Sequence, residues 1–368
     1  MKKVDYVVVG FGGIAENRVA KEGFACDTGR FRPLKRARLV GATDLNQGRR
    51  AAAEALGLRW YPSYDDVLGD KSVDAVYIAT NNRSHVPLAL KALKAGKHVL
   101  VEKPMATTLA DARKLNRTAK SKGLSLAVDH MMVNNAYNIL GRDLIAKGRL
   151  GKVNDGCFHL EYAYGYTPEE AAEWRCNNVA EMGGPIGDVG SHCLYVAEFM
   201  LGKTVKKVAA VYYPKILPIR AEDGAYIKMV FADGTQASVR AAFSEFRGGE
   251  TGTLTNLGWE VYGDRATLRG YGTLFQFSGH ADEPIRMRVE LDDGHAAKVV
   301  RPERIRNIYQ EQIERHARSI QEGRPLTGDE AVHNLALCAA CHESARKGGK
   351  TIVLKQGNAQ AVKNRREK

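Results

Sequence analysis

Asp188 and His192 are the residues whose types and spacing best suit proton transfer. They lie four positions apart in the run GGPIGDVGSH, residues 183–192, at what reads as a helix start. That spacing puts both side chains on one helix face. A histidine can accept a hydroxyl proton as hydride leaves the same carbon, and a neighbouring carboxylate can orient the ring and stabilise its charged form. The same pair could also cap a helix or supply half of a metal site, so spacing alone leaves the assignment open.

Lys103 is a second residue that could act on a substrate, because it follows a strand-like apolar run and precedes Pro104. Ligands of open α/β sheets bind beyond the carboxyl ends of the strands. A lysine there can hydrogen-bond a substrate oxygen and stabilise negative charge that develops on it. We expect the polar residues at this end of the strands to border the cofactor: Thr80, Asn81, Asn82, His85, Glu102 and Lys103.

A glycine-rich turn near the N-terminus predicts dinucleotide binding. The first apolar run ends in GFGGIA, a GxGxxA turn that leads into a helical pattern. Gly10 permits the tight turn, Gly12 lets the backbone approach a pyrophosphate, and the small Ala15 lets the helix pack on the strand. The phosphates would then sit at a helix N-terminus, where free amides favour negative charge. Gly13 and Ile14 complete the expected contact segment.

Asp44, which closes the second predicted strand, favours NAD over NADP. Its carboxylate can accept hydrogen bonds from the ribose hydroxyls and repel a 2′-phosphate. It lies 34 positions after Gly10, against the usual spacing of about 20, which we attribute to an insertion around residues 24–33. Arg49 and Arg50 follow closely enough to keep NADP open as an alternative.

The elements that would position these residues fall into two patterns. Up to about residue 125, apolar runs alternate with helical segments, which predicts βαβ units and a doubly wound parallel sheet. The expected strands span residues 6–10, 37–44, 75–79, 98–102 and 125–129, and the expected helices span residues 49–57, 85–96 and 109–123. Ligands of such a sheet gather at the rim that holds Asp44, Asn81 and Lys103.

After about residue 150 the apolar residues alternate with a period of two, which predicts a large, mostly antiparallel sheet. Asp233-Gly234 and Asp293-Gly294 stand where hairpins would turn. The expected strands span residues 158–164, 208–213, 225–231, 236–242, 259–262 and 287–291, followed by helices over residues 303–322 and 328–346. We therefore expect a Rossmann domain over residues 1–125, an α+β substrate domain over 126–355, and a basic, disordered tail over 356–368.

Composition narrows the class of protein. Of the 368 residues 44% are hydrophobic and 26% charged, as in ordinary globular proteins. The net charge of +13 is spread thinly outside the tail, so we expect no nucleic-acid partner and no membrane. The first apolar stretch runs straight into the glycine turn, which favours a cytoplasmic protein over a secreted one.

The six cysteines are scattered, which favours free thiols. Cys338, Cys341 and His342 have the CxxCH spacing of haem attachment, but they lie in an alanine-rich helical pattern, so we expect ordinary helix packing. We expect NAD as the cofactor and no metal.

Together these motifs resemble the Gfo/Idh/MocA oxidoreductases, which include glucose-fructose oxidoreductase and inositol dehydrogenase. The resemblance covers nearly the whole chain and rests on GFGGIA, the acid at Asp44, ATNNRSH, AGKHVLVEKPMA, GGPIGDVGSH and the late stretch EGRPLTGDEAVHNLALCAACHESARKGG. It implies a Rossmann domain followed by an α/β domain whose open sheet often mediates dimers or tetramers. It also implies hydride transfer to or from a sugar, inositol or polyol carbon.

Carried over by position, the resemblance implies that His192 is the base in the oxidative direction, that Asp188 is its partner, and that Lys103 fixes the reacting oxygen. The family's lysine precedes a proline that can be cis, so we expect a cis Lys103-Pro104 bond. Within the family, an NAD-dependent glycosidase that retains its cofactor and a non-catalytic sensor remain alternatives.

Two departures from the family pattern bear on the substrate. Met132 stands where many members carry an arginine, so the family's substrate contacts do not transfer. A proline at position 185 replaces a third glycine, which should stiffen the loop before Asp188. The remaining pocket residues we expect, aromatic and polar groups suited to sugar faces and hydroxyls, are His130, Asn134, Tyr164, Trp174 and Arg175.

Overall fold

A computed structural model of the protein describes residues 2–244, 257–272 and 287–354. The chain divides into two compact units, one made of Met1–Asn134 and Asn307–Val332, the other of Asn135–Arg306 and His333–Lys368. The first unit thus extends past the boundary expected at residue 125 and takes in a later segment of the chain. The expected tail, residues 356–368, lies outside the described residues.

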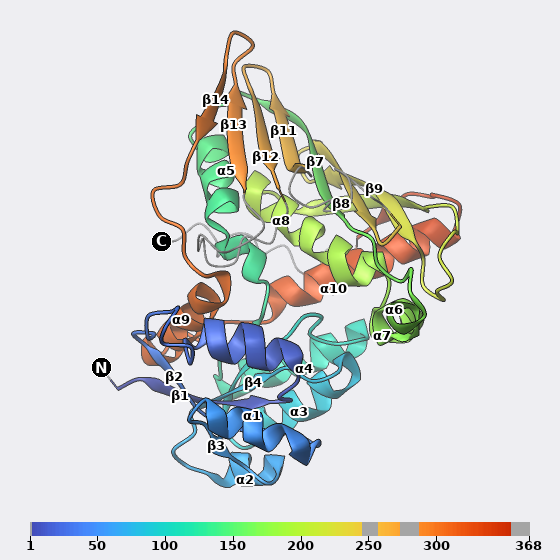
Figure 1. The fold of residues 1–368 in the computed structure, drawn as a ribbon. Helices are drawn as coiled ribbons and strands as arrows, with labels where there is room; N and C mark the ends of the chain where they lie inside the picture. The colour runs from blue at the N-terminus through green and yellow to red at the C-terminus, as the bar shows by residue number, and fades with distance from the viewer. Residues whose placement is uncertain (1, 245–256, 273–286, 355–368) are drawn as a thin grey trace. The chain divides into compact units, whose positions relative to one another are not determined.

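The first unit contains a six-stranded parallel sheet with the order β3-β2-β1-β4-β5-β6. Figure 1 shows these strands with the unit's helices around them. The strands are β1 Val4–Val9, β2 Ala37–Thr43, β3 Arg59–Trp60, β4 Ala75–Ile78, β5 His98–Val101 and β6 Leu126–Val128. The helices are α1 Arg50–Ala55, α2 Tyr64–Gly69, α3 Asn82–Lys94, α4 Leu109–Lys122 and α9 Ile308–Gln321. The doubly wound order confirms the predicted fold class, and the strand order reverses between β1 and β4, where such folds bind ligands.

The strands form where the sequence is apolar and β-branched, because both faces of this sheet are covered. β1 is buried at every residue, and so is β4. Between the first helical segment and β2, residues 24–36 form neither helix nor strand, and this loop adds to the number of residues between Gly10 and Asp44. The late helix α9 packs on β1, β2 and β5, with Ile313 and Ala317 fully buried in the core.

The second unit contains a nine-stranded sheet with the order β14-β13-β12-β11-β7-β10-β9-β8-β15. All neighbouring strands are antiparallel except β7 and β10, which confirms the prediction of a mostly antiparallel sheet. The strands are β7 Val153–Glu161, β8 Val205–Tyr212, β9 Gly224–Phe231, β10 Gln236–Ala242, β11 Leu257–Gly263, β12 Thr267–Tyr271, β13 Arg288–Asp292, β14 Ala297–Val300 and β15 Ile352–Val353.

Two helices, α5 Ala136–Ala146 and α8 Ser191–Leu201, pack against one face of this sheet. The other α-helices among the described residues outside the first sheet are α6 Pro168–Ala172, α7 Trp174–Asn177 and α10 Asp329–Arg346. Trp259 of β11 is fully buried on the helix side, close to where α5 and α8 meet at Gly141 and Met200. The hairpins at Asp233-Gly234 and Asp293-Gly294 are confirmed, with both glycines at positive φ.

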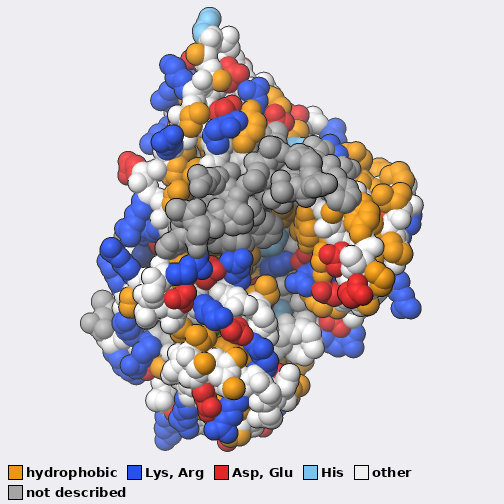
Figure 2. Space-filling view, viewed as in Figure 1, with side chains coloured by type: hydrophobic (Ala, Val, Ile, Leu, Met, Phe, Trp, Pro, Cys, Tyr) orange, Lys and Arg blue, Asp and Glu red, His pale blue; other side chains and the backbone are white. Residues whose placement is uncertain are grey.

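No helix in the described part of the chain is long and apolar enough to cross a membrane. On the face drawn in Figure 2, Lys and Arg side chains are interleaved with Asp and Glu.

Candidate active site

The glycine turn after β1 has the backbone that a pyrophosphate site requires. Gly10 has φ +87°, and a Cβ there would lie 2.8 Å from the carbonyl oxygen of Ala79, so no other residue fits without a shift. A Cβ added at Gly12 or Gly13 would meet nothing within 4 Å. The space in front of this turn is therefore open, and the helical segment Ala15–Gly23 presents its N-terminus there.

Asp44 lies directly against this turn despite its distance in sequence. Its carboxylate accepts hydrogen bonds from the backbone N–H of Phe11 at 2.6 Å and of Asn46 at 2.7 Å. Each carboxylate oxygen has a second lone pair, so ribose hydroxyls can still donate to it. The open space before the glycines and the anchored carboxylate together fit an adenosine diphosphate group.

Arg49 and Arg50, which kept NADP open, both have partners inside the first unit. Arg49 Nε donates to the carbonyl oxygen of Phe11 at 2.7 Å, and its guanidinium is paired with Glu16. Arg50 pairs with Glu54 at 2.8 Å. The glycine turn is thus braced by Arg49, which is held by backbone and carboxylate contacts and is not pre-arranged to receive a 2′-phosphate.

The residues after β4 and β5 form a connected rim. Asn81 caps α3 by accepting a hydrogen bond from the Ser84 N–H at 3.1 Å, and Thr80 is half-buried. His85 is fully buried. Its Nδ1 lies 2.8 Å from the carbonyl oxygen of Pro104 and its Nε2 lies 3.1 Å from that of Thr80. His85 therefore ties the two loops together from behind, and a direct cofactor contact of His85 stays a prediction.

The peptide bond between Lys103 and Pro104 is cis, as the sequence predicts. Lys103 is half-buried at the rim, and its backbone N–H lies 3.3 Å from Glu102 Oε2, to which it donates. The carboxylate of Glu102 thus holds the backbone on which the Lys103 side chain stands.

Two carboxyl groups meet behind Lys103, and sequence reasoning assigned a role to only one of them. The Tyr77 hydroxyl lies 3.0 Å from Glu102 Oε1 and 2.6 Å from Asp129 Oδ2. A phenol has one proton to donate, so one carboxyl group must itself hold a proton. Burial, and then the charge of Glu102, raise the pKa of Asp129 well above its usual value. Burial also raises the pKa of Glu102. We therefore place the shared proton on Asp129.

In the second unit, Asp188 and His192 lie on one continuous helical stretch. Asp188 belongs to a π-helical turn, Ile186–Gly190, which runs directly into α8 and His192. A Cβ at Gly187 would lie 2.1 Å from the carbonyl oxygen of Met182, so this turn requires glycine. π-Turns inside helices are frequent at functional sites. The expected helix start is thus confirmed, with a wider first turn than the sequence indicates.

Each of these two side chains has an anchoring tyrosine. His192 is buried, and its Nδ1 lies 2.6 Å from the Tyr195 hydroxyl. Asp188 Oδ2 accepts a hydrogen bond from the Tyr162 hydroxyl at 3.3 Å and lies 3.6 Å from Arg175 Nε. Burial, and then the charge of Asp188, raise the pKa of Tyr162, so Tyr162 stays a donor.

Three of the predicted substrate residues gather around Asp188. The Arg175 guanidinium stacks on the Trp174 ring at 4.9 Å, and Trp174 is 38% exposed. The Tyr164 ring lies 5.8 Å from that of Tyr162. An exposed aromatic face beside a charged donor suits a sugar. Sequence reasoning missed Tyr162, although it follows β7 and stands two residues before Tyr164.

The other two predicted substrate residues lie in the first unit. His130 is buried. Asn134 donates from Nδ2 to the carbonyl oxygen of Ile308 at 3.3 Å and to Gln312 at 3.1 Å, which fixes it to α9. Met132, in the position of the family's arginine, is fully buried. Substrate contacts of His130 and Asn134 stay predictions.

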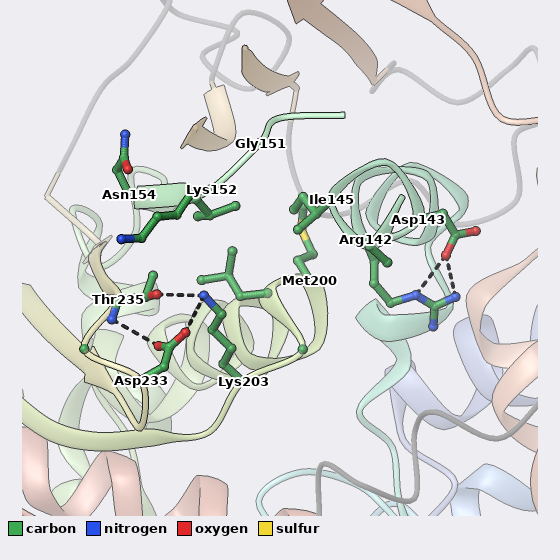
Figure 3. Close-up of a pocket in the computed structure, with 15 residues that line it drawn as sticks. Arg142, Asp143, Ile145, Gly151, Lys152, Asn154, Met200, Lys203, Asp233 and Thr235 are labelled. Carbon is green, nitrogen blue, oxygen red and sulfur yellow. Dashed lines mark hydrogen bonds and ion pairs between the residues drawn. The ribbon is translucent and has the colours of Figure 1, made fainter. Parts of the chain in front are cut away.

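A separate hollow of about 1070 Å³ lies in the second unit, between α5, α8, the start of β7 and the β9–β10 hairpin (Figure 3). Lys203 spans part of it, with Nζ 2.9 Å from Asp233 and 2.7 Å from the Thr235 hydroxyl. None of the predicted site residues is among the described residues that line it. The hollow therefore gives no support to the predicted chemistry.

Comparison with known proteins covers both units. Residues 4–130 match the model of the oxidoreductase family with an NAD-binding Rossmann fold, and residues 141–269 match the GFO/IDH/MocA C-terminal domain. The chain is 30% identical over 291 residues to the 1,5-anhydro-D-fructose reductase of Ensifer adhaerens, covering 78% of this chain and 81% of that protein.

Two further relatives are more distant in sequence. The scyllo-inositol 2-dehydrogenase (NADP(+)) of Bacillus subtilis is 24% identical over 309 residues, which cover 79% of this chain and 81% of the relative. The crystal structure of an aldose-aldose oxidoreductase from Caulobacter crescentus superposes with a TM-score of 0.81 at 24% identity, covering 96% of this chain and all of that one. This last likeness shows the fold.

Proposed function

The chain belongs to the GFO/IDH/MocA family of NAD-binding oxidoreductases, and from that membership we propose that it oxidises or reduces a CH–OH or keto carbon of a sugar, inositol or related polyol. The observation that carries the proposal is the anchored pair of Asp188 and His192 on one helical stretch, next to an exposed Trp174–Arg175 stack. A dinucleotide bound at the glycine turn would accept or supply the hydride.

His192 is the proposed base in the oxidative direction. Its Nδ1 lies 2.6 Å from the Tyr195 hydroxyl, a contact that fixes the orientation of the ring. An imidazole held in this way can take the proton of the substrate hydroxyl. Asp188 supplies negative charge from the same helical stretch, which stabilises the imidazolium that forms. Tyr162 and Arg175 hold the Asp188 carboxylate in place.

Lys103 is the proposed ligand of the reacting oxygen. An ammonium group there stabilises the alkoxide character that develops as the hydroxyl loses its proton. The proton on Asp129 keeps the carboxyl pair behind it from carrying two adjacent negative charges, and Tyr77 donates its hydrogen bond to Glu102. At most one of the two carboxyl groups next to Lys103 then carries a full negative charge.

The pocket residues of the second unit suit a hydroxyl-rich ring. Trp174 offers an aromatic face, and Arg175 and Tyr164 offer donors for hydroxyl groups. His130 and Asn134 are the first unit's proposed contributions. Thr80, Asn81, Asn82 and Glu102 are the proposed rim of the cofactor site, with Ile14 and Ala15 at its helix. Selectivity for NAD over NADP rests on Asp44.

We also propose that the protein is cytoplasmic and that it forms a homodimer or homotetramer. Light scattering of the purified protein would establish the oligomeric state.

The deciding experiment follows nicotinamide absorbance for a panel of sugars, inositols and glycosides with NAD and NADP. We expect NADH to appear with at least one polyol, and His192→Ala to abolish turnover while it retains NAD binding. The matched control is His295→Ala, an exposed histidine at the β13–β14 turn. NADH formation that persists unchanged in both His192→Ala and Lys103→Ala would refute the mechanism. Silence with every compound despite tight NAD binding would favour the retained-cofactor glycosidase or the sensor.

A further inference from the structure

The nine-stranded sheet brings three side chains with metal-binding atoms together. Cys157 and His159 lie two residues apart on β7, so their side chains emerge on the same face of the sheet. Glu260 of β11 pairs directly with Cys157 in the antiparallel register. One ligand atom from each residue lies within 4.8 Å of the other two. Two strands therefore present a thiol, an imidazole and a carboxylate to one point.

The imidazole of His159 is the observation that calls for a ligand. Both ring nitrogens are buried, and neither has a hydrogen-bond partner among the described residues. Burying an unpaired polar group costs free energy, because the group gives up water and gains nothing in return. Glu161 Oε2 lies 3.7 Å from His159 Nδ1. One nitrogen thus faces a carboxylate, and the other remains for an ion, as in the carboxylate–histidine–zinc arrangement.

The neighbours of the other two side chains are compatible with an ion. The Ser238 hydroxyl donates to Cys157 Sγ at 3.2 Å, which orients the sulfur as an outer-shell partner of a metal ligand would. Arg269 Nε lies 3.6 Å from Glu260 Oε1, beyond normal hydrogen-bond distance, and Arg269 also pairs with Asp292 at 3.1 Å. A thiolate and a carboxylate together carry two negative charges, which match one divalent cation.

We propose that Cys157, His159 and Glu260 bind one zinc ion that joins β7 to β11, with water as the fourth ligand. Thiolate and imidazole ligands favour Zn²⁺ over Mg²⁺ or Ca²⁺, which take oxygen ligands. The sequence alone gave no signal, because Glu260 is far along the chain from the other two and no paired-cysteine motif is present. This proposal differs from the expectation, drawn from the sequence, that the protein binds no metal.

The site serves structure rather than hydride transfer, because it lies on the other face of the sheet from the helices. Phe158, between the two β7 ligands, is fully buried and pairs with Trp259, whose ring lies close to Gly141 of α5. The helix α8, which carries His192, contacts β7 and β10. An ion on the opposite face would stabilise the middle of the sheet and leave turnover unchanged.

Metal titration of the full-length protein, stripped with chelator under reducing conditions, tests the proposal. We expect one Zn²⁺ per chain by elemental analysis after dialysis. Co²⁺ in place of Zn²⁺ should give a thiolate-to-cobalt charge-transfer band in the near ultraviolet and the intense visible bands of a tetrahedral site. Zn²⁺ should also raise the thermal midpoint of unfolding, since a ligand that binds only the folded state stabilises it.

Variants decide whether this cluster is the site. Cys157→Ser should abolish the charge-transfer band. His159→Gln and Glu260→Gln should weaken Zn²⁺ binding by about 100-fold or more, and Glu161→Gln by about 10- to 100-fold. The matched controls are Cys26→Ser, a part-buried thiol in the first unit, and Glu290→Gln, a carboxylate on β13. NAD-dependent turnover should be unchanged in Glu260→Gln.

Two results would overturn the proposal: a wild-type protein that retains no zinc after dialysis, or variants that bind it as tightly as the controls do. If Cys157→Ser loses the native circular dichroism spectrum, the zinc affinity of Glu260→Gln decides between the two outcomes, because a carboxamide of the same size leaves the strand intact.

Discussion

Asp129 carries a proton in the folded chain, and this makes stability depend on pH in an unusual direction. Burial raises its pKa well above the usual carboxyl value. Between those two values the folded chain holds a proton that the unfolded chain has released, so the free energy of unfolding falls as the pH rises. A pKa difference of one unit corresponds to about 1.4 kcal/mol.

Asp129→Asn should remove that dependence, because the amide N–H can donate to the Tyr77 oxygen in place of the carboxyl O–H and the amide never ionises. The free energy of unfolding of the variant, taken relative to wild type, should be higher at pH 8 than at pH 5 by about 1 kcal/mol or more. Urea denaturation at both pH values measures the difference, with Asp65→Asn, an exposed aspartate, as the control. An equal change at both pH values would show that Asp129 ionises normally.

Asp44→Asn should relax the choice of cofactor. The amide keeps an acceptor for the Phe11 N–H but loses the negative charge that repels a 2′-phosphate. Repulsion between unit charges about 4 Å apart is about 1 to 4 kcal/mol, depending on exposure to water. The ratio of kcat/KM for NADP to that for NAD should therefore rise by about tenfold or more. An unchanged ratio would mean that selectivity lies elsewhere, and Asp65→Asn again serves as the control.

Sequence reasoning identified the residues with distinctive motifs and missed those defined only by packing. Gly10, Asp44, Lys103, Asp188 and His192 belong to recognisable runs. Tyr77 lies inside an apolar strand, where a buried hydroxyl looks like any aromatic core residue. Its role emerges only when β4, β5 and β6 align side by side and bring Glu102 and Asp129 to one phenol.

At the scale of the element, the π-helical turn before α8 depends on one glycine. Gly187→Ala places a methyl group 2.1 Å from the Met182 carbonyl oxygen, so the turn that carries Asp188 must shift. We expect a loss of about 1 to 3 kcal/mol in stability, as for other overpacked sites, and a fall in kcat/KM.

The matched control is Gly69→Ala at the end of α2, where an added Cβ meets nothing within 4 Å. That change should be neutral or stabilising, because alanine favours helix by up to about 1 kcal/mol over glycine. Chemical denaturation and steady-state kinetics compare the two. A Gly187→Ala protein with wild-type stability and turnover would show that the turn adapts freely.

Strands and helices with strong periodicity were predictable to within a few residues. β10 and the ends of α4 and α10 agree closely with the predicted ranges, since each has a clear apolar pattern and a glycine or charged stop. β3, β12, β14 and β15 were not predicted. β3 and β15 have only two residues each, and β14 is exposed along most of its length, so pairing with a neighbour defines them and composition does not.

For the whole molecule, the loss of stability in acid is set by buried histidines that stay neutral in the folded chain. Burial lowers the pKa of His316 to about 3 and that of His342 to about 4. Each ring has a tyrosine hydroxyl as neighbour, Tyr6 at 2.8 Å from His316 Nδ1 and Tyr212 at 2.9 Å from His342 Nδ1. An unfolded histidine titrates near pH 6.5. Below that pH the unfolded chain therefore binds protons that the folded chain does not bind. As the pH decreases, the free energy of unfolding falls until the pH reaches the pKa values of the two histidines in the folded chain.

The double variant His316→Gln/His342→Gln should flatten this acid limb, because glutamine can hydrogen-bond a tyrosine hydroxyl and does not titrate. From pH 7 to pH 5 each histidine should lower the free energy of unfolding of wild type by about 2 kcal/mol. The variant should not show this loss. Urea midpoints at the two pH values measure the slope, and His295→Gln, an exposed histidine, should retain the wild-type slope. If the double variant loses stability as steeply as wild type, these two rings are protonated in the folded chain and acid sensitivity has another source.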